Sequence, residues 1–309
     1  MKRSGATARS DAMHSATTRR SRAPLTFGIF LLILFNLSTV DAGVFGVDLG
    51  GANSVVATAR RGGVDVLVNE ASRRQTPSTV AFDERQRLLG QSAASQQTKS
   101  PADCVADLKA LIGLSLDDAR LALRSPSPEL VAGKAADADP LVEVKLRGKA
   151  RRFSATQLLA MLLYQLHRCA EREADDALTE CTIAVPLHFS AAQRRSVLDA
   201  AEIAGLKSCR LISDGAAAAL DYALGRSDLP VDSDHHVAFV DAGHMGVQVC
   251  VVRMRRDSLS VLSHSYAAGA GGAVSDARTH IHAHTNAFFF LHPSLLEPPV
   301  KTPTNQDLF

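Results

Sequence analysis

Neither sign of charge is in excess in this sequence of 309 residues, which has 34 lysines and arginines and 32 aspartates and glutamates. The basic residues form no stripe interleaved with aromatic side chains, which is the pattern of a nucleic-acid-binding surface. We therefore expect no nucleic-acid partner. Hydrophobic residues make up 46% of the chain, enough for a substantial core, and the length suits two domains or one large bilobal domain.

Cysteine is scarce, and the cysteines that are present form no metal or redox motif. None belongs to a Cys-x-x-Cys pair, and their odd number argues against a disulfide scaffold. Most lie in apolar segments that predict strand or helix, so we expect buried free thiols. The five are Cys104, Cys169, Cys181, Cys209 and Cys250.

The apolar run from Leu25 to Leu37 is shorter than the about 20 residues that a membrane-spanning helix needs. A polar, basic segment precedes it, and Val40-Asp41-Ala42 follows with small residues that a signal peptidase reads. This order predicts a secretory signal over residues 1–42 and a mature chain that starts near Gly43. An uncleaved anchor and a transit peptide are the alternatives. We expect the protein in the endoplasmic reticulum lumen or secretory pathway, with the membrane contacted only through this segment.

Short apolar segments separated by glycine-rich turns open the rest of the chain and predict strands. After them, residues 101–124 predict one helix, and residues 125–140, rich in proline, alanine, aspartate and glycine, predict a variable loop. The predicted strands of this part are 44–50, 54–60, 64–70 and 79–83.

Two serines mark the starts of helices. Ser154 and Ser190 are each followed three residues later by a glutamine, which completes a capping box. Phe153 and Leu158 suit a hydrophobic staple at the first start, and Gly205 suits the positive φ that follows the end of the second helix. The other predicted elements are strands 181–186, 209–213, 237–241, 246–254 and 258–266 and a helix over 215–226. Their order indicates a mixed α/β lobe that is duplicated once.

Two segments begin with aspartate and contain glycines, and each lies between predicted strands. They are the segments from Asp48 to Ser54 and from Asp241 to Gln248. Such a turn can bring backbone N–H groups close to phosphate oxygens. A carboxylate at the end of the strand can hold hydrated Mg²⁺. Either segment alone is more often a structural turn, whereas the two together favour a phosphate site.

The segment Val185 to Leu206 closely resembles the ATPase-domain signature of the heat-shock protein 70 (DnaK) superfamily. The two Asp-Gly segments resemble the phosphate loops of the fold shared by actin, sugar kinases and heat-shock 70 proteins. The resemblance runs from Val44 to Gly272 and implies an α/β, actin-like (ribonuclease H-like) ATPase fold, with lobe I and part of lobe II. The implied divisions are a basic region and signal peptide at 1–42, lobe I at 43–230, the start of lobe II at 231–272 and a non-family tail at 273–309.

The resemblance also implies a site for ATP or ADP with Mg²⁺. Lys109 falls on the family's catalytic lysine, which helps to position the attacking water and the phosphate. The implied metal ligands are Asp48 and Asp241. The implied nucleotide-binding residues are Asp48, Gly50, Gly51, Ala52, Asn53, Asp214, Asp241, Gly243, His244 and Gly246.

Four residues depart from the pattern of hydrolysing relatives. Gly51, Ala52 and Gly246 stand where those relatives have hydroxyl side chains, and Gln248 stands where they have a carboxylate. Hydrolysis is therefore expected to be impaired or absent, and Lys109 to belong to a degenerate site. The departures look most like the heat-shock 110 branch and its endoplasmic-reticulum 170-kDa class. This likeness implies an ATP-binding holdase or nucleotide-exchange co-chaperone, with a heat-shock 70 chaperone and unfolded polypeptide as partners.

Residues 273–309 do not resemble the helical subdomain that follows in the family, so nucleotide binding is expected to be weak or lost. We expect a disordered tail unrelated to the family, produced by a misjoined gene model. Alternatively, His280, His282 and His284 could place three imidazoles on one strand face as a metal site. For the whole chain, the alternatives are an interaction module that binds no nucleotide and a sugar or acetate kinase of the same fold.

Overall fold

The computed structural model describes residues 43–60, 63–122, 128–133, 140–175, 177–224 and 226–272. All of these residues belong to one compact unit. The expected signal segment, the expected tail and the three histidines of the alternative metal site lie outside the described residues. No helix within the described ranges is long and apolar enough to cross a membrane.

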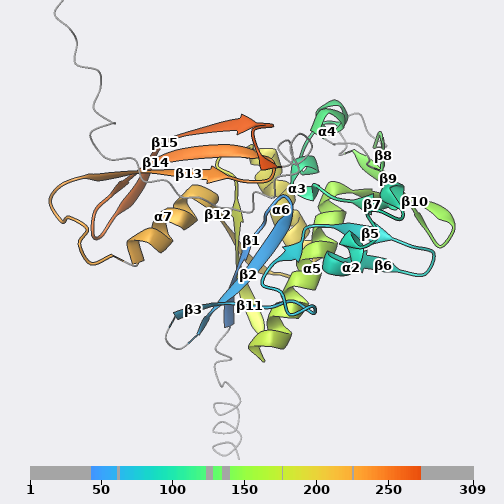
Figure 1. Ribbon diagram of the computed structural model, residues 1–309, viewed down its shortest axis with the longest axis horizontal. Coiled ribbons are helices and arrows are strands. Elements are labelled where there is room, and N and C mark those ends of the chain that lie inside the picture. Colours follow the sequence, from blue (N-terminus) through green and yellow to red (C-terminus); the bar gives the residue numbers. More distant parts are fainter. Residues whose placement is uncertain are drawn as a thin grey trace, which may run out of the picture. The chain divides into compact units, whose positions relative to one another are not determined.

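The main sheet brings the ends of parallel strands to one edge (Figure 1). Its strands are β1 (Gly43–Asp48), β2 (Asn53–Arg60), β3 (Gly63–Val66), β4 (Thr76–Pro77), β11 (Leu178–Val185) and β12 (Ser208–Ser213). The order is β12–β11–β1–β2–β3, with β4 paired to β2. Strands β1, β11 and β12 run parallel, and β2 runs antiparallel to β1. Because parallel strands end at the same edge, Asp48 and Asp214 both come to that edge.

Helices α5 (Ala155–Ala174) and α6 (Ala191–Ile203) begin at the predicted capping serines. At the start of α5, Gln157 N–H donates to Ser154 Oγ at 3.2 Å and Ser154 N–H donates to Gln157 Oε1 at 3.0 Å. The same two bonds join Ser190 and Gln193 at the start of α6. Gly205, after α6, has φ of +92°, as predicted. Both capping boxes and the glycine stop are confirmed.

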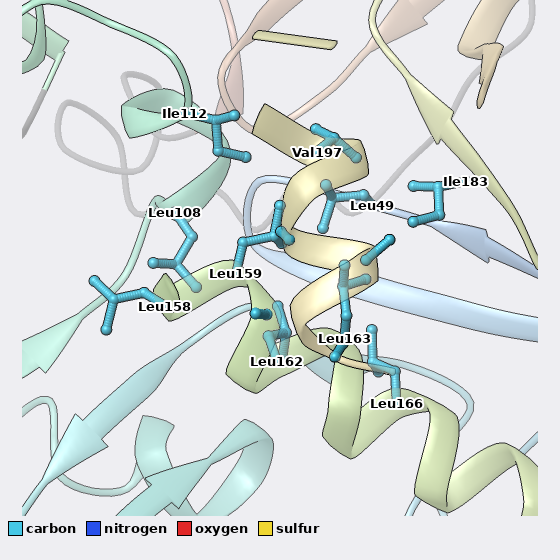
Figure 2. Close-up of a cluster of buried hydrophobic side chains, with 14 of the residues drawn as sticks. Leu49, Leu108, Ile112, Leu158, Leu159, Leu162, Leu163, Leu166, Ile183 and Val197 are labelled. Carbon is cyan, nitrogen blue, oxygen red and sulfur yellow. The ribbon is translucent and has the colours of Figure 1, made fainter. Parts of the chain in front are cut away.

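Leucines of α5 form the centre of the first core. Figure 2 shows Leu159, Leu162 and Leu166 beside Val197 of α6 and Leu49, and all five are almost fully buried. Burial of each leucine stabilises the fold by about 1.5–3 kcal/mol. Because Leu49 directly precedes the first glycine-rich turn, this core also fixes where that turn begins.

The segment from 101 to 124 is not one helix, contrary to the prediction. It forms η1 (Pro101–Asp103), β7 (Cys104–Val105), α3 (Leu108–Leu111) and α4 (Leu116–Ala122). Asp107 and Gly113 have left-handed backbone conformations, with φ of +53° and +60°, and a right-handed helix cannot pass through them. The turn of α3 between these two breaks carries Lys109.

Two small sheets form in this part of the chain, and β7 of the segment belongs to one of them. One contains β5 (Val80–Phe82), β6 (Arg87–Leu89) and β7, with α2 (Gly90–Ala94) following β6, and the other contains β8 (Glu129–Val131), β9 (Leu141–Leu146) and β10 (Lys149–Ser154). The prediction of a loop over 125–140 is therefore wrong at β8, whose residues bond to β9. The strand predicted over 64–70 ends at Val66. Beyond it, Asn69 Oδ1 accepts from Ala71 and Arg73 N–H, which turns the chain.

A second core forms around an antiparallel meander that the sequence predicts. The meander contains β13 (His235–Ala242), β14 (Gly246–Met254) and β15 (Leu259–Ala268), and α7 (Asp214–Leu224) packs against it. Its buried side chains are Ala219, Leu229, Val237, Phe239, Cys250, Val252 and Met254. Helix α7 thus packs in the second core. It lies before residue 230, the predicted boundary between lobe I and lobe II, and that boundary stays a prediction.

Candidate functional site

A cleft of about 750 Å³ opens where the main sheet ends and where β13 turns into β14. The first Asp-Gly turn lines one part of it and the second Asp-Gly turn lines another. The structure brings all residues of the predicted site together here, whereas the sequence separates them into four segments. They are Asp48, Gly50, Gly51, Ala52, Asn53, Lys109, Asp214, Asp241, Gly243, His244 and Gly246.

Three aspartates and one lysine share the base of this cleft. Burial raises the pKa of Asp48; Lys109 opposes that shift, and the negative charges of Asp214 and Asp241 add to it. Lys109 Nζ lies 3.6 Å from Asp214 Oδ2, and both side chains are largely buried. The base of the cleft therefore holds more negative than positive charge, as a cation-binding site requires.

Gln248 joins two of these carboxylates, a role that sequence reasoning missed. It lies on β14 directly opposite Asp241 on β13. Its Nε2 donates to Asp241 Oδ2 at 2.7 Å and to Asp214 Oδ2 at 3.1 Å. The sequence showed only that a carboxylate is absent at 248. The amide holds the two aspartates together by hydrogen bonds, where a bound cation would otherwise be needed.

Two oxygens in this cluster are buried without a hydrogen-bond partner among the described residues, Asp214 Oδ1 and Gln248 Oε1. A buried acceptor without a donor is costly, and a hydrated cation supplies donors. In the described part of the chain, no three histidine, cysteine, aspartate or glutamate side chains are arranged to hold a metal alone. The two oxygens are therefore suited to accept hydrogen bonds from the waters of a hydrated Mg²⁺, which proteins usually bind through one or two carboxylates together with phosphate and water.

Close contacts exclude or crowd a side chain at Gly50, Gly51 and Gly246 of the two turns. A Cβ on Gly50 would lie 2.0 Å from the backbone oxygen of Asn53, so no side chain fits there. A Cβ on Gly51 would lie 2.7 Å from Met245 Cγ, a flexible side chain of the second turn. A Cβ on Gly246 would lie 2.5 Å from the backbone oxygen of Ala267. Position 246 therefore lacks a hydroxyl side chain where β15 packs closely against the turn.

A hydrogen bond links the second turn to the segment that carries Lys109. His244 Nε2 lies 3.2 Å from Asp107 Oδ1, and both side chains are mostly buried. Asp107 is the residue with left-handed backbone that precedes α3. The contact joins the first core to the second across the cleft and holds Asp107 in its left-handed conformation.

His188 also lines the cleft, although sequence reasoning gave it no role. Its ring stacks on Tyr266 of β15 with centroids 3.6 Å apart, and its buried Nδ1 has no hydrogen-bond partner among the described residues. Burial lowers the pKa of His188, and the charge of Lys109 lowers it further. An apolar cavity of about 440 Å³ adjoins the cleft and shares His188 and Tyr266 with it. The only sequence signal was its place in the turn before the α6 cap.

Each of the two α/β cores contains an antiparallel meander whose first strand ends in an Asp-Gly turn, and both turns lie beside one shared cleft. This arrangement defines the actin-like ATPase fold class. Comparison with protein families agrees with this class. The chain belongs to the Hsp70 protein family, whose sequence model matches residues 44–288. The resemblance predicted from the α6 signature and the two turns is thereby confirmed.

Several curated proteins are similar to this chain. Heat shock 70 kDa protein 14 of Arabidopsis thaliana is 38% identical over 229 residues, 74% of this chain and 28% of that protein. Heat shock protein hsp88 of Neurospora crassa is 39% identical over 245 residues, 78% of this chain and 34% of that protein. Heat shock 70 kDa protein 16 of Arabidopsis thaliana is 38% identical over 238 residues, 74% of this chain and 30% of that protein. The chain spans about a third of the length of these relatives.

Proposed function

We propose that residues 43–272 bind the phosphates of ATP or ADP, together with Mg²⁺, between the two Asp-Gly turns. The convergence of both turns, Lys109 and three aspartates on one cleft supports this most strongly. Glycine-rich turns of this kind can offer backbone N–H groups to phosphate oxygens, and Lys109 adds positive charge beside Asp214. Mg²⁺, when bound with the nucleotide, supplies neutralisation of phosphate charge, with Asp48 and Asp241 as its protein ligands.

The same residues support binding with little or no hydrolysis. No side-chain hydroxyl is present at 51, 52 or 246, and the amide of Gln248 occupies the place of a carboxylate. Lys109, the residue matched to the family's catalytic lysine, is paired with Asp214. Single-turnover assays test this point. Negligible phosphate release is expected, and robust turnover that Lys109→Ala abolishes would contradict it.

Calorimetric titration of the full chain with ADP, with and without Mg²⁺, tests binding. Weak, Mg²⁺-dependent binding is expected for the wild type, and Asp241→Asn should weaken it about tenfold or more, that is by ~1.4 kcal/mol or more. Asp234→Asn is the matched control, because Asp234 directly precedes β13 and pairs with Arg255 outside the cleft. Absence of binding by the wild type, or equal weakening by both variants, would contradict the proposal.

We further propose the cellular role of a chaperone of the heat-shock 70/110 type in the endoplasmic reticulum. In this role the nucleotide-bound protein acts as a holdase for unfolded polypeptide, or promotes nucleotide exchange on a heat-shock 70 partner. The family and its named heat-shock relatives support the class. Suppression of aggregation of a heated client and acceleration of ADP release from a heat-shock 70 protein are the two measurements. Activity in neither would contradict the role.

The location is tested separately from the activity. Residues 1–42, fused to a cytosolic reporter, should direct it into microsomes, where added protease cannot reach it. A reporter that stays fully accessible to protease would contradict the secretory signal and leave the chaperone role unaffected.

A second candidate is a protein-interaction module that binds no nucleotide. The amide of Gln248 favours it, since this group already bridges Asp214 and Asp241 without any cation. The calorimetric titration separates the two candidates, because the module should give no heat with ADP at any Mg²⁺ concentration.

A further inference from the structure

Two of the five cysteines lie directly opposite each other on neighbouring strands. Cys181 of β11 and Cys209 of β12 are register partners in a parallel pair, so both side chains point to the same face of the sheet. Neighbouring strands lie about 4.8 Å apart. Cα atoms that a disulfide joins lie about 4.4–6.8 Å apart. The backbone therefore already holds these two residues at a distance that a disulfide can span.

The two thiols differ in access. Cys181 is 2% exposed and lies between Cys209 on one side and its other register partner, Phe45 of β1, on the other. Cys209 is half-buried and lies on β12, the edge strand of the main sheet. A small reagent can thus reach Cys209 from solvent, whereas it cannot reach Cys181 first.

The contact between the thiols also makes them chemically unequal. A hydrogen bond between the two side chains lowers the pKa of Cys209, while the same bond together with burial raises the pKa of Cys181. Cys209 is therefore the more acidic thiol of the pair. Burial raises the pKa of Cys104 and of Cys169 to about 11, and it also raises the pKa of Cys250. Of the five cysteines, Cys209 alone has a lowered pKa, and the thiolate is the reactive form of a cysteine.

We propose that Cys181 and Cys209 form a dithiol modification site that reacts with small disulfide oxidants, such as glutathione disulfide. In the first step the Cys209 thiolate attacks one sulfur of the oxidant, an S–S bond forms to Cys209, and one thiolate leaves. In the second step Cys181, after giving up its proton to that leaving thiolate or to solvent, attacks Cys209 Sγ and displaces the second thiol. The protein pair is oxidised to one disulfide, and one oxidant molecule is reduced to two thiols.

The site is separate from the cleft. Both strands lead toward cleft residues, β11 to Pro186 and β12 to Asp214, but the cysteines lie several residues earlier in each strand. A bond between them joins the edge strand covalently to its neighbour within the sheet. The reaction of the two cysteines does not depend on nucleotide binding.

The test is to treat the native full chain with glutathione disulfide, quench it with acid, and map its thiols by mass spectrometry. The wild type should lose two of its five thiols, carry no glutathione and yield one peptide pair linked through Cys181 and Cys209. Cys181→Ala should instead keep glutathione on Cys209, and Cys209→Ser should react far more slowly. Cys104→Ala is the matched control, because it removes a buried thiol elsewhere and should leave the linked pair unchanged.

Two results would overturn the inference. One is a wild type that carries glutathione at Cys209 with no linked pair. The other is a disulfide that joins either residue to Cys104, Cys169 or Cys250. Because Cys209 is half-buried at a sheet edge, Cys209→Ser should fold, and a circular dichroism spectrum like that of the wild type verifies this before the assay.

Discussion

The two Asp-Gly turns have similar sequences, but the strands and the hydrophobic cores next to them differ in extent. The first follows β1, which lies between β11 and β2 in the main sheet, and β13, which precedes the second, is bonded to β14 alone among the described strands. The core beneath the first turn has 33 buried hydrophobic residues in the described part of the chain, against seven beneath the second. Because local stability follows buried apolar contact, the second turn is expected to open more readily than the first.

The largest expected effects are on stability, and hydrogen exchange tests the difference between the two turns. Leu162→Ala removes a fully buried side chain from the α5 cluster and should lower the free energy of unfolding by about 2–5 kcal/mol. Val252→Ala, its counterpart on β14, should cost about 1–2 kcal/mol because fewer methyl groups are lost. Urea denaturation measures both, and hydrogen exchange should show faster opening of β13–β15 than of β1. Opening of β13–β15 as slow as that of β1 would remove the contrast.

Gln248→Glu sharpens the comparison at the cleft itself. The substitution replaces a donor that bridges Asp214 and Asp241 by a further carboxylate, so stability without metal should fall by about 1–3 kcal/mol. Mg²⁺ should raise the melting temperature of the variant more than that of the wild type, because a ligand of the native state stabilises it by mass action.

Gln248→Leu is the matched control for this effect. It removes the donor without adding charge, and so should lack the response to Mg²⁺. An equal Mg²⁺ response in Gln248→Glu and Gln248→Leu would show that charge at 248 does not govern cation binding.

A pair of glycine substitutions compares the two turns one residue at a time. Gly246→Thr places a side chain against the backbone oxygen of Ala267 and should destabilise the protein by about 1–2 kcal/mol. Gly51→Thr meets the flexible side chain of Met245, which can move, and should cost less. Thermal denaturation measures both variants. A larger cost at 51 than at 246 would show that the packing around the second turn is the looser of the two.

The smallest expected effect lies in the link between α7 and β13. Arg226 Nε donates to Asp228 Oδ1 at 2.8 Å, and this bond lowers the pKa of Asp228 to about 2. A carboxyl group with a lowered pKa in the folded state contributes stability above its unfolded pKa. That contribution is lost as the pH falls toward about 2. Asp228→Asn should therefore slightly reduce the loss of unfolding free energy at acid pH, and it should leave the pH dependence above pH 5 unchanged. The effect is small because the pair is exposed.

Much of the fold was predictable because its signals are local. Capping boxes at Ser154 and Ser190 depend on residues three apart, and the meander over 235–268 follows from apolar strands separated by turns. The prediction failed over 101–124, where Leu108 and Leu111 have helical spacing but Asp107 and Gly113 take left-handed conformations. Contacts far away in the sequence stabilise those conformations, such as that of Asp107 with His244.

The sequence by itself determined where the two Asp-Gly turns lie, because an aspartate at the end of a strand followed by glycine restricts where a turn can form. It also showed which hydroxyl and carboxylate groups are missing. Only the tertiary structure decided what stands in their place. The bridge from Gln248 to Asp214 and the pairing of Cys181 with Cys209 join residues from different segments, and each depends on strand register, which packing of the whole sheet sets and local sequence does not.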